Sequence, residues 1–392
     1  MIARLTIPEN TSLEQVWPTA LAKGARFLDG MLEGPWWQMK AVLLVLAVCL
    51  LRAFPSYDAL GSRFVEQKWN DALVKADRPL ADMGRLYPPE SHESKLTFRM
   101  TVPLVARVLR LRMTGVLVLS GVLGALLLWL SLMIAFEVSQ SRRAALWIAL
   151  AVGCSWAGEA AFHELRGGYY DAAALVLLML AIQAKVPGLV ALWTFAAAWT
   201  DERALLAVPC VLLFHFVQRA SGVRASLGVL MGLCGYGLSR LCMTETGGYA
   251  TTLAGTGLEL LGRQLNVLPM ALWSGLGGCW VPVLGGAAVL AMRRRWGLGV
   301  VFTLMVGALS LSAFCVIDTT RSVAYLLPAA FVGLAVLRRS ESRAWVERLA
   351  AAAGLLSFFV PAFYLEGGSG VWWLYPLPVQ AARWLVPFLP GL

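Results

Sequence analysis

Long apolar segments follow one another along almost the whole chain, and they constrain its fold more than any other feature of the sequence. A helix needs about 20 mostly apolar residues to cross the hydrocarbon of a bilayer. We interpret eleven runs as candidate spans, and the fifth of them is the shortest. They lie at 38–54, 113–136, 144–161, 170–185, 187–200, 203–218, 225–242, 265–291, 297–316, 323–337 and 349–365. The sequence therefore predicts an all-α, polytopic membrane protein with about 11 transmembrane helices, in a range of roughly 10–13.

The composition excludes the other broad classes of protein. Hydrophobic residues make up 59% of the 392 residues and charged residues only 14%. Soluble domains carry about 25% charged residues, and a soluble globule of this size could not bury so much apolar surface. A disordered chain would be poor in apolar residues. The seven cysteines form no CxxC pair and lie in or beside apolar runs, so we interpret them as packing residues.

The distribution of charge predicts how the chain is oriented. The net charge is +10, which in a membrane protein is explained by basic cytoplasmic loops rather than by nucleic-acid binding. With a cytoplasmic N-terminus, the inner loops hold 12 bases and 3 acids, and the short outer loops hold 5 bases and 9 acids. We therefore expect an integral, multi-pass protein of the cell (inner) membrane whose acidic face is outside.

Three regions are predicted along the chain. Residues 1–37 form a cytoplasmic N-terminus with an amphipathic helix in 11–34 and no cleavable signal. Residues 38–365 form the transmembrane domain, including a long outer loop at 55–112. Residues 366–392 form an interfacial or re-entrant tail rich in aromatic residues.

Apolar residues at helical spacing predict two surface helices in the outer loop, the first through Val65, Trp69, Leu73 and Ala76 and the second through Val102, Val105, Val108 and Leu109. A turn-rich stretch beginning at Tyr87 joins them. Asp58 precedes both, just after the first span. A carboxylate so close to the membrane could act as a general base, although it could equally cap the helix that follows.

The densest polar cluster, 158–171, has the residue types of a metal site. Glu159 and His163 are four residues apart and therefore share one helix face, and Asp171 could be a third ligand. Such ligands suit Mg²⁺ or Mn²⁺. The alternative is a solvated loop with one salt bridge and a helix cap at Asp171. No HExxH, Walker A, dinucleotide-binding or GxSxG motif is present, so no nucleotide cofactor is expected.

Two short outer turns carry charged residues between membrane helices: 200–203 holds Asp201, Glu202 and Arg203, and 318–321 holds Asp318 and Arg321. A planar guanidinium at a membrane rim suits a phosphate or pyrophosphate group. Helix capping in the first turn, and a salt bridge within the second, are the alternatives.

Topology and local motifs together resemble the GT-C class of glycosyltransferases, polytopic enzymes that use polyprenyl-phosphate sugars. Asp58 falls where the class carries its first-loop acidic residue. Tyr169–Asp171, followed by the leucine-rich stretch 172–182, is similar to the outer Asp that heads the fourth span, and 200–203 is similar to the charged turn after it. Arg107 lies in a segment similar to the Arg/Pro-rich stretch before the second span. The chain lacks the paired Asp-Asp or Glu-x-Asp of well-studied subfamilies.

The resemblance implies a transferase that moves a sugar, hexose or pentose, from a polyprenyl-phosphate carrier to a lipid or glycan acceptor of the cell envelope at the outer face. Asp58 would be the base, and Mg²⁺ or Mn²⁺ could be held by Glu159, His163 and Asp171. The expected substrate-binding residues are Asp171, Asp201, Glu202, Arg203, Asp318 and Arg321. A lipid-linked glycan polymerase or ligase, and a transporter or flippase, remain alternatives.

Overall fold

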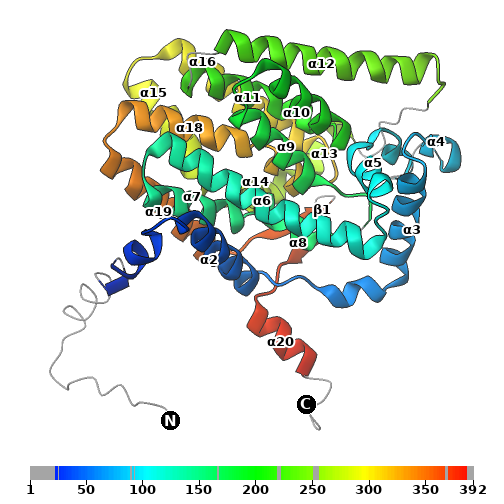
Figure 1. Ribbon diagram of the computed structural model, residues 1–392, viewed down its shortest axis with the longest axis horizontal. Helices are drawn as coiled ribbons and strands as arrows, with labels where there is room; N and C mark the ends of the chain where they lie inside the picture. Colours follow the sequence, from blue (N-terminus) through cyan, green and yellow to red (C-terminus); the bar gives the residue numbers. More distant parts are fainter. Residues whose placement is uncertain are drawn as a thin grey trace.

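The structure is a computed structural model that describes residues 23–24, 26–88, 91, 93–165, 167–218, 222–249, 256–366 and 370–385. The side chain of Asp58 lies outside the described part. Helices dominate the molecule (Figure 1), as the apolar runs predict. They are α2 Trp37–Arg52, η1 Tyr57–Gly61, α3 Arg63–Asp77, α4 Met83–Leu86, η2 Glu93–Phe98, α5 Thr101–Val108, α6 Met113–Ser139, α7 Arg142–Gly153, α8 Trp156–His163, α9 Asp171–Gln183, α10 Pro187–Thr200, α11 Ala204–Gln218, α12 Gly222–Glu245, α13 Leu258–Gln264, η3 Leu265–Val267, α14 Leu268–Leu276, η4 Gly277–Cys279, α15 Trp280–Met292, α16 Trp296–Phe314, α17 Thr319–Ala324, α18 Leu327–Ser340, α19 Arg343–Phe359 and α20 Leu377–Leu385.

Ten of the eleven apolar runs coincide with one helix or with consecutive helices, whereas the last, 349–365, begins in α19 and ends in strand β1, Phe363–Glu366. In the described chain, five helical segments are long and apolar enough to cross a membrane: Met113–Ser139, Gly222–Glu245, Leu258–Met292, Trp296–Phe314 and Thr319–Ser340. The pair α7 and α8 gives a sixth if it is one span bent by 54°. The mainly helical fold is therefore confirmed, and its long apolar helices are compatible with a membrane protein, whereas the count of about eleven spans stays a prediction.

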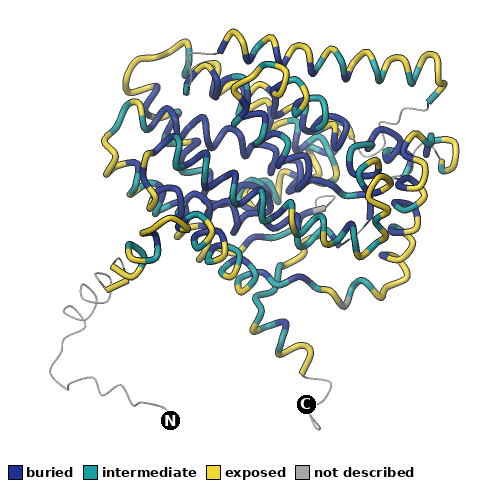
Figure 2. Tube along the Cα trace, in the orientation of Figure 1, coloured by how far each residue is buried: buried dark blue, intermediate teal, exposed yellow. Residues whose placement is uncertain are grey.

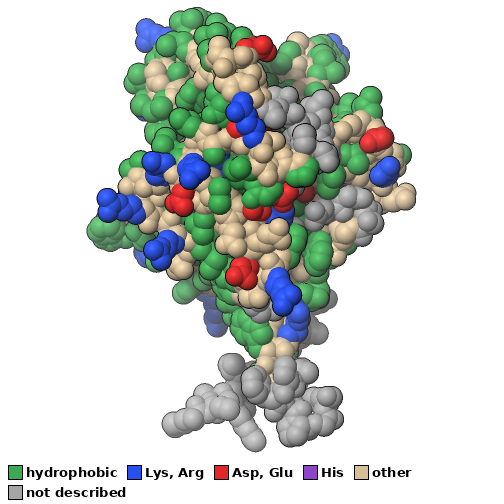
Figure 3. Space-filling view, turned by 90° about the vertical axis from the view of Figure 1, so that its right-hand side faces the viewer, with side chains coloured by type: hydrophobic (Ala, Val, Ile, Leu, Met, Phe, Trp, Pro, Cys, Tyr) green, Lys and Arg blue, Asp and Glu red, His purple; other side chains and the backbone are tan. Residues whose placement is uncertain are grey.

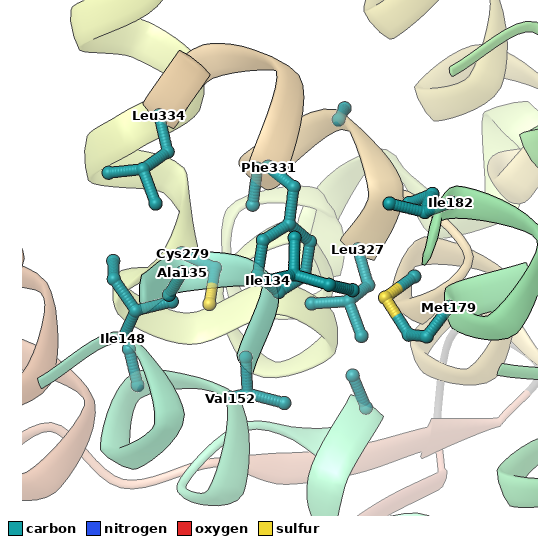
Figure 4. Close-up of a cluster of buried hydrophobic side chains, with 14 of the residues drawn as sticks. Ile134, Ala135, Ile148, Val152, Met179, Ile182, Cys279, Leu327, Phe331 and Leu334 are labelled. Carbon is teal, nitrogen blue, oxygen red and sulfur yellow. The ribbon is translucent and has the colours of Figure 1, made fainter. Parts of the chain in front are cut away.

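The hydrophobic core is centred on the α17–α18 segment, whose apolar window is wholly buried. Figure 4 shows side chains from α6, α7, α9, η4 and α18 meeting around Phe331, and the labelled ones are Ile134, Ala135, Ile148, Val152, Met179, Ile182, Cys279, Leu327, Phe331 and Leu334. In contrast, α12 lies at the edge of the molecule and is exposed along much of its length (Figure 2). An exposed apolar helix of this kind is suited to contact with lipid.

Close backbone contact holds α15 against α18. A methyl group added to Gly333 would lie 2.1 Å from the carbonyl oxygen of Pro282, and one added to Gly286 would lie 2.7 Å from the Cα of Gly333. Small residues let membrane helices approach closely enough to pack by van der Waals contact. The central helix therefore depends on glycine at position 333.

Replacing Gly333 by alanine is expected to destabilise the protein by about 1–3 kcal/mol, because the added methyl group must push α15 and α18 apart. The measurement is the apparent Tm in detergent. Gly307→Ala is the matched control, since nothing lies within 4 Å of its added methyl group. Equal Tm values for the two variants would contradict the close contact.

The segment 55–112 packs against the bundle through the helices that the periodicity predicts. The first of these, α3, buries Val65, Trp69 and Ala76, and they join residues of α5, α6 and α9 in one hydrophobic cluster. The indole N–H of Trp69 donates to the carbonyl of Leu165 at 2.8 Å, which links α3 to the α8–α9 loop. Figure 1 shows α3, α4 and α5 grouped at one end of the bundle.

A buried lysine connects separate parts of the segment 55–112. Lys75 is buried, and its Nζ donates to the carbonyl oxygens of Ala81 and Thr97, both at 2.8 Å. Burial lowers the pKa of Lys75 to about 8, although Asp82 nearby opposes this shift. A neutral amine has two N–H groups, which match the two carbonyl acceptors.

The lowered pKa of Lys75 makes the stability depend on pH. Between about 8 and the ordinary value of 10.5 the native amine is neutral while the unfolded amine is protonated. The unfolded state then binds more protons, so the free energy of unfolding rises with pH across this window and is flat just below it. The apparent Tm is expected to rise from pH 8 to 10. Lys75→Met should flatten this rise, and an unchanged slope in that variant would contradict the assignment.

The C-terminal tail departs from the all-α expectation. Phe363–Glu366 (β1) and Gly370–Trp373 (β2) pair as an antiparallel hairpin, with Tyr364 opposite Trp372. Aromatic and β-branched residues favour strands. Side-chain hydroxyls of neighbouring helices accept hydrogen bonds from backbone N–H groups of β1. The N–H of Leu365 donates to the Thr320 hydroxyl at 3.0 Å. Helix α20 then returns to the segment that follows α2, where the Gln380 side chain donates to the Ser56 hydroxyl at 2.6 Å.

The N-terminal region is described only in part. Residues 1–22, and with them half of the predicted amphipathic segment 11–34, lie outside the described residues. Residues 26–32 are helical, and Asp29 pairs through both carboxylate oxygens with Arg143, at 2.6 and 2.5 Å. This ion pair connects the segment before α2 to the start of α7.

Candidate functional site

Charged residues from several loops meet at the end of the bundle where α3–α5 lie. Figure 3 looks onto this end and shows acidic and basic side chains close together near its centre, surrounded by hydrophobic ones. The loops involved join α8 to α9, α10 to α11 and α16 to α17. Asp171 and Arg321 lie in the first turns of α9 and α17, so the helix starts fix their positions.

Arg321 is the centre of the buried charge cluster. Its Nε lies 2.5 Å from Asp171 Oδ2 and 3.0 Å from Glu164 Oε1, and its Nη1 lies 2.7 Å from Asp318 Oδ2. The side chain is 1% exposed. A buried guanidinium requires such partners, because an unpaired buried charge is strongly destabilising.

Arg203 connects a second carboxylate to the same cluster. Its Nη2 lies 2.7 Å from Asp201 Oδ2 and 3.3 Å from Asp171 Oδ1, and its Nε donates to Asp201 Oδ1 at 2.9 Å. Arg99, from the segment between η2 and α5, contributes a third guanidinium 3.6 Å from Asp201 Oδ2. The Tyr325 hydroxyl donates to Asp171 Oδ1 at 3.0 Å. Asp171 is thus shared between two arginines and a tyrosine.

The environment shifts the pKa values of the loop residues in opposite directions. Burial raises the pKa of Asp201, but the guanidinium groups of Arg203 and Arg99 outweigh it and lower that pKa to about 2. Burial, and then the carboxylate of Asp171, raise the pKa of Glu164 well above its usual range. One carboxyl group of the cluster is therefore firmly ionised, and another favours its neutral form.

A cavity of about 490 Å³ opens beside the cluster. Its wall is formed by η1, the start of α3, α8, the α8–α9 loop, α17, the β1–β2 hairpin and α20. Its lining includes the polar residues Arg321, Glu164 and His163, and Arg383 of the tail. The aromatic residues of the lining are Phe64, Trp156, Tyr169, Tyr364, Trp372, Trp373 and Tyr375. Apolar walls with a few convergent polar groups are typical of small-molecule sites.

Five of the predicted substrate-binding residues come together in the cluster, and they are Asp171, Asp201, Arg203, Asp318 and Arg321. The exception is Glu202, which lies half exposed and pairs with Arg240 at 2.9 Å. Asp58 belongs to η1, and its neighbours Ser56 and Ala59 line the cavity. The backbone of the predicted base therefore lies at the cavity wall.

The three predicted metal ligands have different partners. Glu159 lies 2.5 Å from Arg52 Nη1, His163 Nε2 lies 3.2 Å from the carbonyl oxygen of Ala53, and Asp171 is engaged by Arg321. Among the described residues, no group of three His, Cys, Asp or Glu side chains could hold a metal ion. The predicted ligand set does not fit a shared ion, so no chemical step is derived through one.

Sequence reasoning missed Glu164, Trp156, Arg99 and Tyr325 as members of the site. Glu164 was visible as part of the polar stretch 158–171, but nothing local distinguishes it from a solvated acid. The others come from a surface loop and from apolar segments, where an arginine or an aromatic residue carries no specific signal. No family model, no curated protein and no solved structure matches the chain.

Proposed function

We propose that the protein is a membrane glycosyltransferase that moves a sugar from a polyprenyl-phosphate carrier to a lipid or glycan acceptor at the outer face of the inner membrane. The observation that carries the proposal is the cavity of about 490 Å³, with the buried Arg321 in its lining and Ser56 and Ala59, which flank the Asp58 position, in its wall. Displacement of a phosphate at a sugar carbon requires a cationic group for the phosphate and a base for the acceptor.

Arg321 is the residue proposed to bind the carrier phosphate. A guanidinium stabilises phosphate oxygens through directed, charge-assisted hydrogen bonds, and a buried one acts with less screening by water. The carboxylates around Arg321 hold its orientation before the ligand arrives. Its charge would offset the negative charge that grows on the phosphate as the glycosidic bond breaks.

Asp58 is proposed to be the general base. In the reaction, an acceptor oxygen forms a bond to the anomeric carbon as the bond from that carbon to the phosphate oxygen breaks. The bonding electron pair leaves with the phosphate, and the acceptor proton passes to Asp58. The aromatic side chains around the cavity supply flat apolar surface for the sugar and for the first prenyl units.

The proposed topology follows from the charge pattern and the apolar runs. About eleven spans, a cytoplasmic N-terminus and an outer active face would put the cavity beside the outer leaflet. A lipid-linked donor suits that location because nucleotide sugars are cytoplasmic. The prenyl tail would lie along the lipid-facing helices, with affinity from its apolar area.

The test is sugar transfer by the purified protein in lipid nanodiscs, with a panel of labelled polyprenyl-phosphate sugars. Wild type is expected to release label to acceptor or water from at least one carrier, and empty nanodiscs are not. The same assay with EDTA, and with Mg²⁺ or Mn²⁺ restored, tests the predicted metal dependence. No release from any carrier, together with no polyprenyl lipid bound in native mass spectrometry, would contradict the proposal.

A further inference from the structure

The lining of the cavity includes two residues that each have a buried donor without a hydrogen bond. Within the described part of the chain, Arg321 Nη2 and the indole Nε1 of Trp156 have no hydrogen-bond partner, although Nη2 lies 3.9 Å from Asp201 Oδ2. Both residues line the cavity, and they are 1% and 3% exposed. More than about 90% of buried polar groups in proteins find a partner. Two unpaired donors on one cavity therefore call for an explanation by what the cavity binds.

The rest of each side chain is held firmly. Three carboxylates fix Nε and Nη1 of Arg321, so Nη2 is the remaining arm of an oriented fork. Trp156 begins α8, directly after the bend that follows α7, and its ring packs on that of Tyr364 with centroids 4.8 Å apart. Donors held in place in this way bind a ligand without an additional cost in side-chain entropy.

The chemistry of the two donors selects an acceptor-only ligand. Guanidinium and indole N–H groups donate and never accept. The three arginines of the cluster face four carboxyl groups, Glu164, Asp171, Asp201 and Asp318, so the cluster offers no net positive charge. Directed hydrogen bonds must therefore supply the recognition. Phosphate oxygens are acceptors of this kind.

We propose that Trp156 is a phosphate-binding residue, whose indole N–H and Arg321 Nη2 together hold the phosphate group of the prenyl carrier. The inference rests on the proposed function and adds a neutral donor to its substrate site. It also explains why a tryptophan with no protein partner for its N–H occupies a buried position.

Trp156→Phe tests the inference, because it removes the N–H and keeps an aromatic ring. The affinities of farnesyl phosphate and farnesol are measured on the full-length protein in nanodiscs. Farnesyl phosphate is expected to bind about tenfold more weakly to the variant, as for loss of one hydrogen bond to a charged group, and farnesol is expected to bind as to wild type. Trp156→His keeps a ring N–H and should recover part of the affinity.

Trp280→Phe is the matched control, because the Trp280 N–H has a protein partner, the carbonyl of Leu272 at 2.7 Å. It is expected to lower the apparent Tm and leave farnesyl phosphate affinity unchanged, whereas Trp156→Phe breaks no hydrogen bond among the described residues and should lower Tm only through the smaller volume of its ring.

Four outcomes of these measurements distinguish the proposed role of Trp156 from the proposed glycosyltransferase function. Selective loss of farnesyl phosphate affinity in Trp156→Phe supports the inference. Unchanged affinity, or equal loss for farnesol, overturns it while sugar transfer by wild type leaves the proposed function intact. A wild type that binds farnesyl phosphate no better than farnesol overturns the inference and the phosphate site of the proposed function together.

Discussion

Asp171→Ala is expected to lower the free energy of unfolding by about 3–5 kcal/mol, the range seen when one partner of a buried ion pair is removed. The substitution takes away the acceptor of Arg321 Nε, Arg203 Nη2 and the Tyr325 hydroxyl at once. Two buried guanidinium groups would lose a shared counter-charge. The measurement is the apparent Tm in detergent.

Two variants control this experiment. Asp171→Asn keeps the size of the side chain and one acceptor oxygen, so it is expected to fall between wild type and Asp171→Ala. Glu66→Ala removes an exposed carboxylate of α3 and should change the stability by less than about 0.5 kcal/mol. A Tm for Asp171→Ala equal to that of Glu66→Ala would show that the buried cluster does not hold the loops together.

Asp58→Asn is expected to reduce sugar transfer by about a hundred- to ten-thousand-fold, the range for loss of a general base. The amide cannot accept the acceptor proton at neutral pH. The measurement is the initial rate with the best carrier of the panel, and the apparent Tm should match that of wild type. Asp77→Asn, the same change at an exposed position of α3, should leave the rate unchanged.

Full turnover by Asp58→Asn would remove this residue from the mechanism. Asp171 and Asp201 are poor substitutes for a base, because arginines engage both of them. Glu164 also lies 3.0 Å from Arg321 Nε and favours its neutral form, but it is the carboxyl group among the described residues of the cavity lining, so it would be the next residue to change. Loss of activity with a lowered Tm would instead point to a misfolded protein.

Most of the helices could be predicted from the sequence, because long apolar runs indicate where buried or lipid-facing helices lie. The run at 144–161, however, predicts a single span, whereas the structure divides it into α7 and α8, which are bent by 54°. Gly153 and Ser155 flank the break, and such residues tolerate kinks. Neither residue requires a kink. The bend therefore depends on tertiary contacts, which the local sequence does not predict.

The charged turns were also recognisable, but their arrangement was not. The salt bridge between Asp318 and Arg321, one of the two interpretations of that turn, is present at 2.7 Å. The pairing of Arg321 with Asp171 spans 150 residues. A sequence shows which residues are polar at a membrane rim, and only the packing of helices decides which of them meet. The cavity could not be predicted from the sequence for the same reason, because part of its wall comes from the C-terminal tail.

The bend between α7 and α8 has a consequence for how the protein is made. The break frees the carbonyl of Ala151, which accepts a hydrogen bond from Ser357 at 3.0 Å, and the same hydroxyl accepts one from the Gly278 N–H at 2.6 Å. Ser357 is synthesised about two hundred residues after the bend that it stabilises. While the ribosome is still translating the middle of the chain, the kinked segment has no such partner. The cavity can take its final shape only when translation has nearly ended, so a chain released early carries the catalytic candidates without the pocket that unites them.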